Sequence, residues 1–101
     1  AEVEKILDSV FGVQESAIVG LPHPDYGEGV TAFITTDQDV SLVESEIKST
    51  MTLMLAKFKV PLTIIQLSIL PKNAMGKVQK IVLKEKFADL YTNDLNNKTT
   101  N

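Results

Sequence analysis

This chain of 101 residues contains neither cysteine nor arginine, and each absence excludes a kind of chemistry. Without cysteine there can be no disulfide, no thiolate nucleophile and no cysteine-ligated metal. Without arginine, any bound anion must be met by lysine ammonium groups and not by a bidentate guanidinium. Long apolar runs are also missing: none approaches the roughly 18 to 20 residues that span a bilayer, and the opening segment AEVEKILDSV lacks the features of a signal peptide. We therefore expect a soluble chain without a membrane span, located by default in the cytoplasm.

Charge is divided unevenly along the chain. Residues 1–47 hold ten acidic residues and one lysine, whereas residues 48–101 hold nine lysines and three acidic residues. A lysine-rich half could suit phosphates, nucleic acid or a membrane surface. Because the net charge is −3 and no basic stripe is interleaved with aromatic residues, we expect no nucleic-acid partner.

The first third of the chain predicts a helix followed by two strands. Apolar residues at helical spacing predict a short amphipathic helix over residues 1–11, ended by a left-handed Gly12. Runs of β-branched and apolar residues predict strands at 15–20 and 30–36. The segment between them, LPHPDYGEG, is dense in proline and glycine and is therefore predicted to be a loop.

The most secure helix of the pattern covers residues 41–58, SLVESEIKSTMTLMLAKF. Ser41 and Glu44 have capping-box spacing at its start. We expect Met51 and Met54 to fill the core, and the apolar face of the helix to comprise Val43, Ile47, Met51, Leu55 and Phe58. Residues 62–70, LTIIQLSIL, are apolar at both alternating positions, which predicts a strand covered on both faces.

Helical spacing returns over residues 80–91, and residues 92–101 form a polar tail that we expect to be disordered, so the folded domain is predicted to be 1–91. The order helix, strand, strand, helix, strand, helix predicts an α+β fold, a two-layer domain with a small sheet of about three strands flanked by helices. The second and third strands would be joined by a crossover through the long helix, right-handed if they are parallel.

Two glycine motifs resemble phosphate-binding loops but fail their requirements. A P-loop ending at Gly76–Lys77 would need a glycine five residues before Gly76 and a serine or threonine after the lysine, where the chain has Pro71 and Val78. The GEG motif at 27–29 would need a third glycine at Ala32 and a strand directly before it. Both phosphate-binding motifs are therefore excluded.

One loop offers three possible metal ligands, His23, Asp25 and Glu28. A single histidine without evident supporting groups favours a simpler interpretation, in which the prolines and glycines shape the turn and the polar side chains cap its backbone. We expect no metal site.

The segment LPKNAMGKVQK, residues 70–80, concentrates three lysines between the last predicted strand and the last predicted helix. It permits two interpretations. It could be a turn at residues 73–76 with solvated lysines, which is the usual state of lysine. Alternatively, Pro71 and Gly76 fix the path of the loop, so that Lys77 is presented at a defined place to stabilise negative charge in a transition state.

These segments closely resemble the small C-terminal domain of the adenylate-forming superfamily, which includes acyl-CoA synthetases, amino-acid adenylation domains and firefly luciferase. The likeness covers nearly the whole chain, through AEVEKIL, AIVGLPHPDYGEGVTAFI, KFKVP and LPKNAMGKVQK in the family's order and spacing. The wording PKNAMGKVQK resembles malonyl-CoA ligases and related short- and medium-chain acyl-CoA synthetases.

The resemblance implies that Lys77 is the lysine that enters the active site during the first half-reaction, in which a carboxylic acid attacks ATP. Lys72, Lys80 and Gly76 are weaker candidates for contacts with the phosphates of the nucleotide or of coenzyme A. It also implies ATP and coenzyme A as substrates, magnesium in the full-length enzyme, and a large N-terminal domain of the same enzyme as partner.

The chain lacks the family's phosphate loop and its ribose-binding aspartate, which belong to the large domain, so the fragment alone is expected to be inactive. Two alternatives stay open. The parent could be an adenylation domain that loads a carrier protein, or the fold could serve as a non-enzymatic interaction module. The retained Gly76–Lys77 argues against the second alternative.

Overall fold

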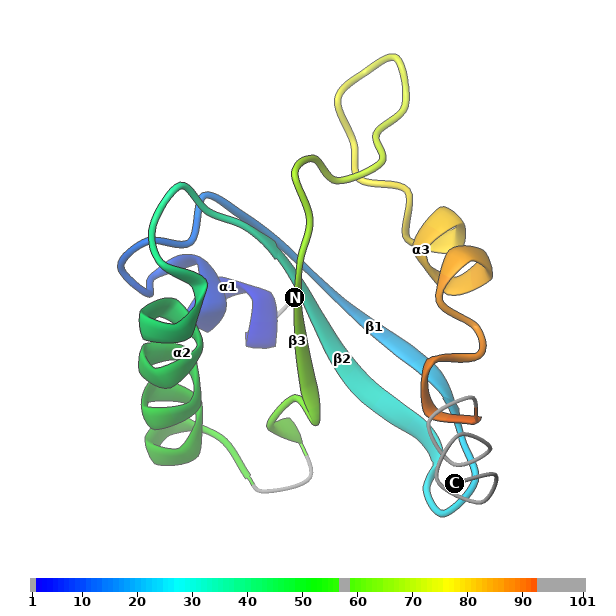
Figure 1. Ribbon diagram of the computed structural model, residues 1–101, viewed down its shortest axis with the longest axis horizontal. Coiled ribbons are helices and arrows are strands. Elements are labelled where there is room, and N and C mark those ends of the chain that lie inside the picture. Colours follow the sequence, from blue (N-terminus) through cyan, green and yellow to red (C-terminus); the bar gives the residue numbers. More distant parts are fainter. Residues whose placement is uncertain (1, 57–58, 93–101) are drawn as a thin grey trace.

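The computed structural model describes residues 2–56 and 59–92. Figure 1 shows the predicted order of elements, which is confirmed: α1 (Glu2–Asp8), β1 (Glu15–His23), β2 (Gly27–Thr35), α2 (Val40–Met54), β3 (Thr63–Gln66) and α3 (Lys80–Lys86). The α+β class with a three-stranded sheet is therefore confirmed. The predicted tail lies outside the described residues from position 93 onward.

β2 lies at the centre of the sheet, in the order β1-β2-β3. It pairs antiparallel with β1 and parallel with β3. The crossover from β2 through α2 to β3 is thus present, and the two strands it joins are parallel as the prediction required. No helix in the described part of the chain is long and apolar enough to cross a membrane.

The long loop predicted between the first two strands is wrong. β1 continues to His23 and β2 begins at Gly27, so the connection is a tight turn. Pro22 is tolerated inside β1 because this strand lies at the edge of the sheet, where a missing N–H breaks no ladder. His23 closes the turn, its Nδ1 accepting hydrogen bonds from the backbone N–H groups of Asp25 (3.0 Å) and Tyr26 (3.4 Å).

α2 begins one residue earlier than predicted, and its cap is a different residue. The Asp39 carboxylate accepts a hydrogen bond from the Ser41 N–H at 2.9 Å, so Ser41 lies inside the first turn and the predicted capping box is wrong. Aspartate is as good an N-cap as serine, which allows the helix to begin at Val40. The helix ends at Met54 and not at residue 58 as predicted, and Met54 is 62% exposed and not the core residue we expected. The predicted core position of Phe58 lies outside the described residues.

Two hydrophobic clusters lie on opposite faces of the sheet, because successive strand residues point to opposite sides. The first lies under α1 and α2 and includes Leu7, Val10, Ala32, Ile34, Val43, Ile47, Met51 and Ile64. The second lies under α3 and includes Ala17, Val19, Leu21, Phe33, Leu70 and Leu83. Figure 1 shows the sheet between α1 and α2 on one side and α3 on the other.

The end of the described chain packs as predicted, although the regular helix is shorter than expected. α3 ends at Lys86, yet Leu83 is buried and Phe87, Leu90 and Tyr91 all pack against the second cluster. The Tyr91 hydroxyl lies 2.7 Å from Thr31 Oγ1 and 3.2 Å from Thr63 Oγ1, so it ties this segment to β2 and β3. β3 is also shorter than predicted, but its successive residues Ile64 and Ile65 do pack on opposite faces of the sheet.

Candidate functional site

Residues 71–80, which we call the lysine hairpin, leave the body of the domain between β3 and α3 and project from one end of it (Figure 1). Lys72 and Val78 form an antiparallel bridge. The Gln79 N–H donates to the Pro71 carbonyl at 2.8 Å, and the Asn73 N–H donates to the Lys77 carbonyl at 2.9 Å. The segment is therefore a hydrogen-bonded hairpin with a defined shape.

Asn73 organises the tip of the lysine hairpin. Its Oδ1 accepts hydrogen bonds from the N–H groups of Met75 (2.9 Å) and Lys77 (3.0 Å), while its carbonyl accepts from Gly76 N–H at 3.0 Å. Gly76 has φ of +84°, a conformation that L side chains rarely adopt. The predicted turn at residues 73–76 is confirmed. Asn73 was not singled out from the sequence, although asparagine before a glycine turn is the usual signal for such a bond.

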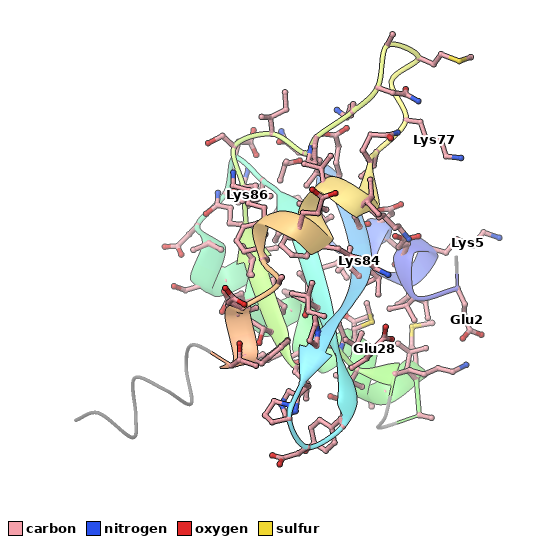
Figure 2. All side chains as sticks on the ribbon, turned by 90° about the vertical axis from the view of Figure 1, so that its right-hand side faces the viewer. Glu2, Lys5, Glu28, Lys77, Lys84 and Lys86 are labelled. Atoms are coloured by element: carbon pink, nitrogen blue, oxygen red, sulfur yellow. The ribbon has the colours of Figure 1, made fainter. Side chains whose placement is uncertain are left out.

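The hairpin presents Lys77 to solvent. Residues 72–77 are all exposed, and Met75 at the tip is 92% exposed. In Figure 2 the Lys77 side chain extends away from the body of the domain. Within residues 2–56 and 59–92, Lys77 forms no salt bridge, so its ammonium is available to an external anion.

The other two lysines of the hairpin are engaged by carboxylates. Lys72 Nζ lies 2.5 Å from Glu15 Oε2, and Lys80 Nζ lies 2.8 Å from Glu4 Oε2. The structure thus brings all four predicted site residues to one hairpin, but it distinguishes the ammonium of Lys77 from its two neighbours. Contact of Lys72, Lys80 or Gly76 with phosphates stays a prediction.

Glu4 has further partners besides Lys80. Its Oε2 accepts a hydrogen bond from the Ile18 N–H at 2.8 Å. Partial burial raises the pKa of Glu4, but the hydrogen bonds from Lys80 and from the Ile18 backbone, together with the charge of Lys80, lower it more, to about 2. Glu4 is therefore ionised at neutral pH.

Sequence reasoning missed Glu4 and Glu15. The uneven charge was the available signal, since a lysine-rich half and an acidic half of one domain can pair. Among residues 2–56 and 59–92, three salt bridges join the halves, the third being Lys59 Nζ to Glu2 Oε1 at 3.1 Å. The pairing itself could not be foreseen, because it depends on how the fold brings distant segments together.

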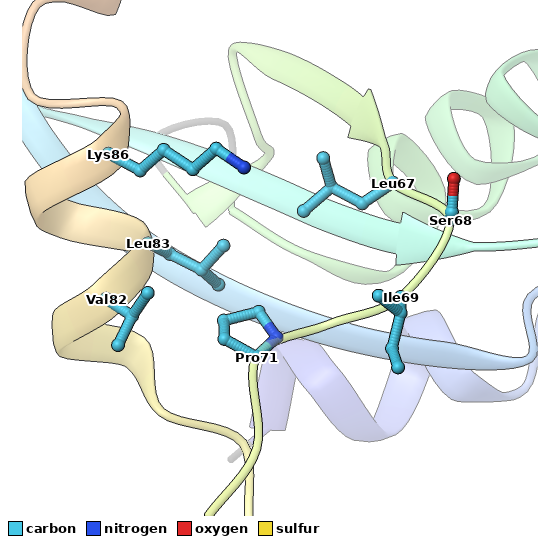
Figure 3. Close-up of a pocket in the computed structure, with 7 residues that line it drawn as sticks. All are labelled: Leu67, Ser68, Ile69, Pro71, Val82, Leu83 and Lys86. Atoms are coloured by element: carbon cyan, nitrogen blue, oxygen red, sulfur yellow. The ribbon is translucent and has the colours of Figure 1, made fainter.

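A pocket of about 340 Å³ lies beside the base of the lysine hairpin, between the segment after β3 and α3 (Figure 3). It is lined mainly by apolar side chains, with Lys86 at one side: Leu67, Ser68, Ile69, Pro71, Val82, Leu83 and Lys86. It offers no carboxylate. Among the described residues, no group of three or more histidine, cysteine or acidic side chains could hold a metal ion.

Comparison with known families identifies the domain. The family model described as "AMP-binding enzyme C-terminal domain" matches residues 2–77, a span that ends at Lys77. The chain belongs to this family. The resemblance to the C-terminal domain of adenylate-forming enzymes is therefore confirmed.

The relatives of this AMP-binding C-terminal domain are acyl-CoA ligases. It is 35% identical over 88 residues to the long-chain-fatty-acid–CoA ligase FadD13 of Mycobacterium tuberculosis, covering 87% of this chain and 17% of the relative. It is 40% identical over 85 residues to a 3-[(3aS,4S,7aS)-7a-methyl-1,5-dioxo-octahydro-1H-inden-4-yl]propanoyl:CoA ligase of Rhodococcus jostii, covering 84% and 16%.

The fold is also that of solved ligase structures. The crystal structure of ATP-bound MatB from Rhodopseudomonas palustris matches with a TM-score of 0.83 and 44% identity, over 89% of this chain and 18% of that one. The chain thus spans less than a fifth of the length of the relatives it matches.

Proposed function

We propose that this domain works as the mobile C-terminal part of an ATP-dependent, AMP-forming acyl-CoA ligase, and that Lys77 supplies positive charge to carboxylate activation. The observation that carries the proposal is the presentation of Lys77 on an exposed, hydrogen-bonded hairpin without a salt bridge among the described residues. Family membership supports it, as do relatives named as CoA ligases and the ATP bound to the similar MatB.

In the proposed first half-reaction, a carboxylate oxygen of the acid attacks the α-phosphorus of ATP. The bond from that phosphorus to the oxygen bridging to the β-phosphate breaks, and pyrophosphate leaves with the bonding pair, giving an acyl adenylate. The Lys77 ammonium would lie against the carboxylate and α-phosphate oxygens and stabilise the negative charge that develops there. In the second half-reaction, the coenzyme A thiol attacks the acyl carbon and AMP leaves.

The proposal requires a partner that holds the nucleotide and the acid. We assign that role to a large N-terminal domain of the same enzyme, against which this domain would rotate between the two half-reactions and withdraw Lys77 after the first. Magnesium would enter bound to ATP and be held with the phosphates by that partner. The pocket beside α3 offers no site for it, since it contains no carboxylate.

The test is Lys77→Ala in the full-length ligase, with the two half-reactions assayed separately. Removing one preorganised charge-stabilising group costs about 10²- to 10³-fold in rate, so acyl-adenylate formation should slow by that order. Thioester formation from a preformed adenylate should be nearly unchanged. Lys84→Ala is the matched control, because Lys84 is an exposed lysine on α3, outside the hairpin.

An equal loss in both half-reactions would indicate a folding or docking defect instead of a catalytic role. No loss in the first half-reaction would refute the assignment of Lys77. Replacing coenzyme A by a carrier protein that bears a free thiol, in the same assay, distinguishes the ligase from a carrier-loading adenylation enzyme.

A further inference from the structure

We propose that Glu4 and Glu15 are positioning residues that act on Lys77 through the two ends of the lysine hairpin, Glu15 by holding Lys72 and Glu4 by holding Lys80. We call this pair of salt bridges the clasp. The inference rests on the proposed function of Lys77, but it concerns residues of a different segment, α1 and the start of β1.

The clasp places one salt bridge at each end of the hairpin. Lys72 lies in the β-bridge at the start of the hairpin. Lys80 directly follows Gln79, whose N–H donates to the Pro71 carbonyl at the base of the hairpin. Each of these lysines is paired, at 2.5 Å and 2.8 Å, with a glutamate from the first fifteen residues. Both strands of the hairpin stem are therefore tied to the same part of the domain.

The two glutamates are themselves anchored in one place. Glu15 is the first residue of β1 and pairs with Thr35 across the sheet. Glu4 lies on α1, and its Oε2 accepts the N–H of Ile18, three residues further along β1. The clasp thus connects the base of the hairpin to the first residues of β1, which is hydrogen-bonded into the sheet.

The hairpin needs such a support because its own hydrogen bonds fix its shape but not its direction. The bonds made by Asn73 are all internal to residues 71–80, and Gln79 makes one bond outside them, its carbonyl accepting the Val82 N–H of α3 at 3.1 Å. Residues 72–77 are exposed, so packing restrains the hairpin at its stem, where Val78 packs against the second cluster, and not at its tip. An error of about 1 Å in the position of a catalytic group can cost on the order of 100-fold in rate, so the direction of the hairpin matters more to catalysis than to stability.

The clasp makes a different prediction from direct phosphate binding by Lys72 and Lys80. If these lysines bind phosphates, replacing a glutamate by glutamine frees an ammonium and should strengthen nucleotide binding or leave it unchanged. If the glutamates position Lys77, the same replacement should slow the first half-reaction. The variants Glu4→Gln and Glu15→Gln therefore separate the two roles, whereas replacing the lysines would not.

The chain offers a matched control in the salt bridge between Lys59 and Glu2. It is also a lysine–glutamate pair, at 3.1 Å and largely exposed, and it joins α1 to the segment before β3. Glu2→Gln removes the same charge from the same helix without touching the clasp. It should leave acyl-adenylate formation unchanged.

The experiment measures acyl-adenylate formation by the full-length ligase for Glu4→Gln, Glu15→Gln and Glu2→Gln, each alone and combined with Lys77→Ala. We expect each clasp variant to lower the rate constant about 3- to 10-fold with an unchanged KM for ATP, since exposed ion pairs are individually weak. In the Lys77→Ala background the same changes should have no further effect, because their action runs through Lys77.

Three results would overturn the inference. A lower KM for ATP in the glutamine variants would assign Lys72 and Lys80 to the phosphates. An equal loss of rate in the wild-type and Lys77→Ala backgrounds would show that the clasp has only a structural role. If neither Glu4→Gln nor Glu15→Gln slows acyl-adenylate formation while Lys77→Ala does, the clasp does not position Lys77. If Lys77→Ala itself causes no loss, it is the proposed function that fails. Glu15→Gln, at a part-exposed pair, keeps the test valid if Glu4→Gln does not fold.

Discussion

At the scale of single residues, the Glu4 carboxylate has a strongly lowered pKa. The carboxylate accepts hydrogen bonds from several donors, which among the described residues include the ammonium of Lys80 and the backbone N–H of Ile18. An ionised carboxylate with several donors is favoured over its protonated form, which explains why the pKa falls to about 2 in spite of partial burial.

This shift predicts how stability depends on pH. Because the folded-state pKa of Glu4 (about 2) lies below its ordinary value of 4.5, the stabilisation is fully present above about pH 4.5 and is lost as pH falls through about 2. We expect Glu4→Gln to lower the free energy of unfolding by about 1 to 2 kcal/mol at pH 7, after allowing for screening at the half-exposed Lys80.

Urea unfolding of the wild type and Glu4→Gln between pH 7 and pH 2 measures this difference. It should shrink on acidification below pH 4.5. Glu2→Gln is the control, since its exposed pair should contribute little at any pH. A difference between Glu4→Gln and wild type that stays constant from pH 7 to pH 2 would contradict the role of the ionised carboxylate.

Single residues could be predicted from the sequence where a local pattern marks them, and not where their contacts are made by distant segments. The role of Lys77 was proposed from a local motif that resembles the family and stays a prediction, whereas the burial of Met51, predicted from helical spacing, is confirmed. Met54 was misplaced because it shares the helical spacing of the core residues, although it is the last residue of α2 and is 62% exposed. The partners of Lys72 and Lys80 were missed because no local pattern links them to Glu15 and Glu4.

At the scale of elements, the start of α2 gives a direct test of the structure against the sequence pattern. The Asp39 carboxylate accepts the Ser41 N–H, whereas the pattern predicted that Ser41 would be the cap. Asp39→Ala should therefore lower the free energy of unfolding by about 1 kcal/mol. Ser41→Ala should change it by no more than a few tenths of that value, because alanine is well tolerated inside a helix.

Thermal or urea unfolding of both variants measures these changes. The reverse order, with Ser41→Ala the more damaging, would restore the capping box predicted from the sequence. Elsewhere the elements were predicted well in kind and less well in length. Proline and glycine around His23 indicated a loop, but an edge strand accommodates Pro22 and the pairing of β1 with β2 extended the hairpin.

At the scale of the whole molecule, the sheet separates two cores and the lysine hairpin leaves from one end of it. Phe33 and Ile34 are neighbours in β2 and are both fully buried, yet they belong to different clusters. The order of the predicted helices and strands made the α+β class predictable. The direction in which the hairpin projects was not predictable, since it depends on where β3 ends and α3 begins.

The exposure of the lysine hairpin leads to a prediction for the chain by itself. Lys77 is exposed to solvent, and no surface formed by the described residues encloses its ammonium. We expect the purified 101-residue chain to release no pyrophosphate from ATP with any carboxylic acid. Carboxylate-dependent pyrophosphate release above a Lys77→Ala control would contradict this and would locate a complete active site within the chain.

β1 also has a free side, and two of its residues protect it from self-association. In a regular strand the N–H groups of alternate residues point the same way, so Ile18 and Pro22 face the open edge together. The first donates to the Glu4 carboxylate, which occupies the place of a carbonyl from an added strand, and the second has no N–H to offer. Charge and proline are the usual means by which edge strands avoid forming aggregates, so we expect Glu4 also to oppose strand-to-strand pairing at this edge.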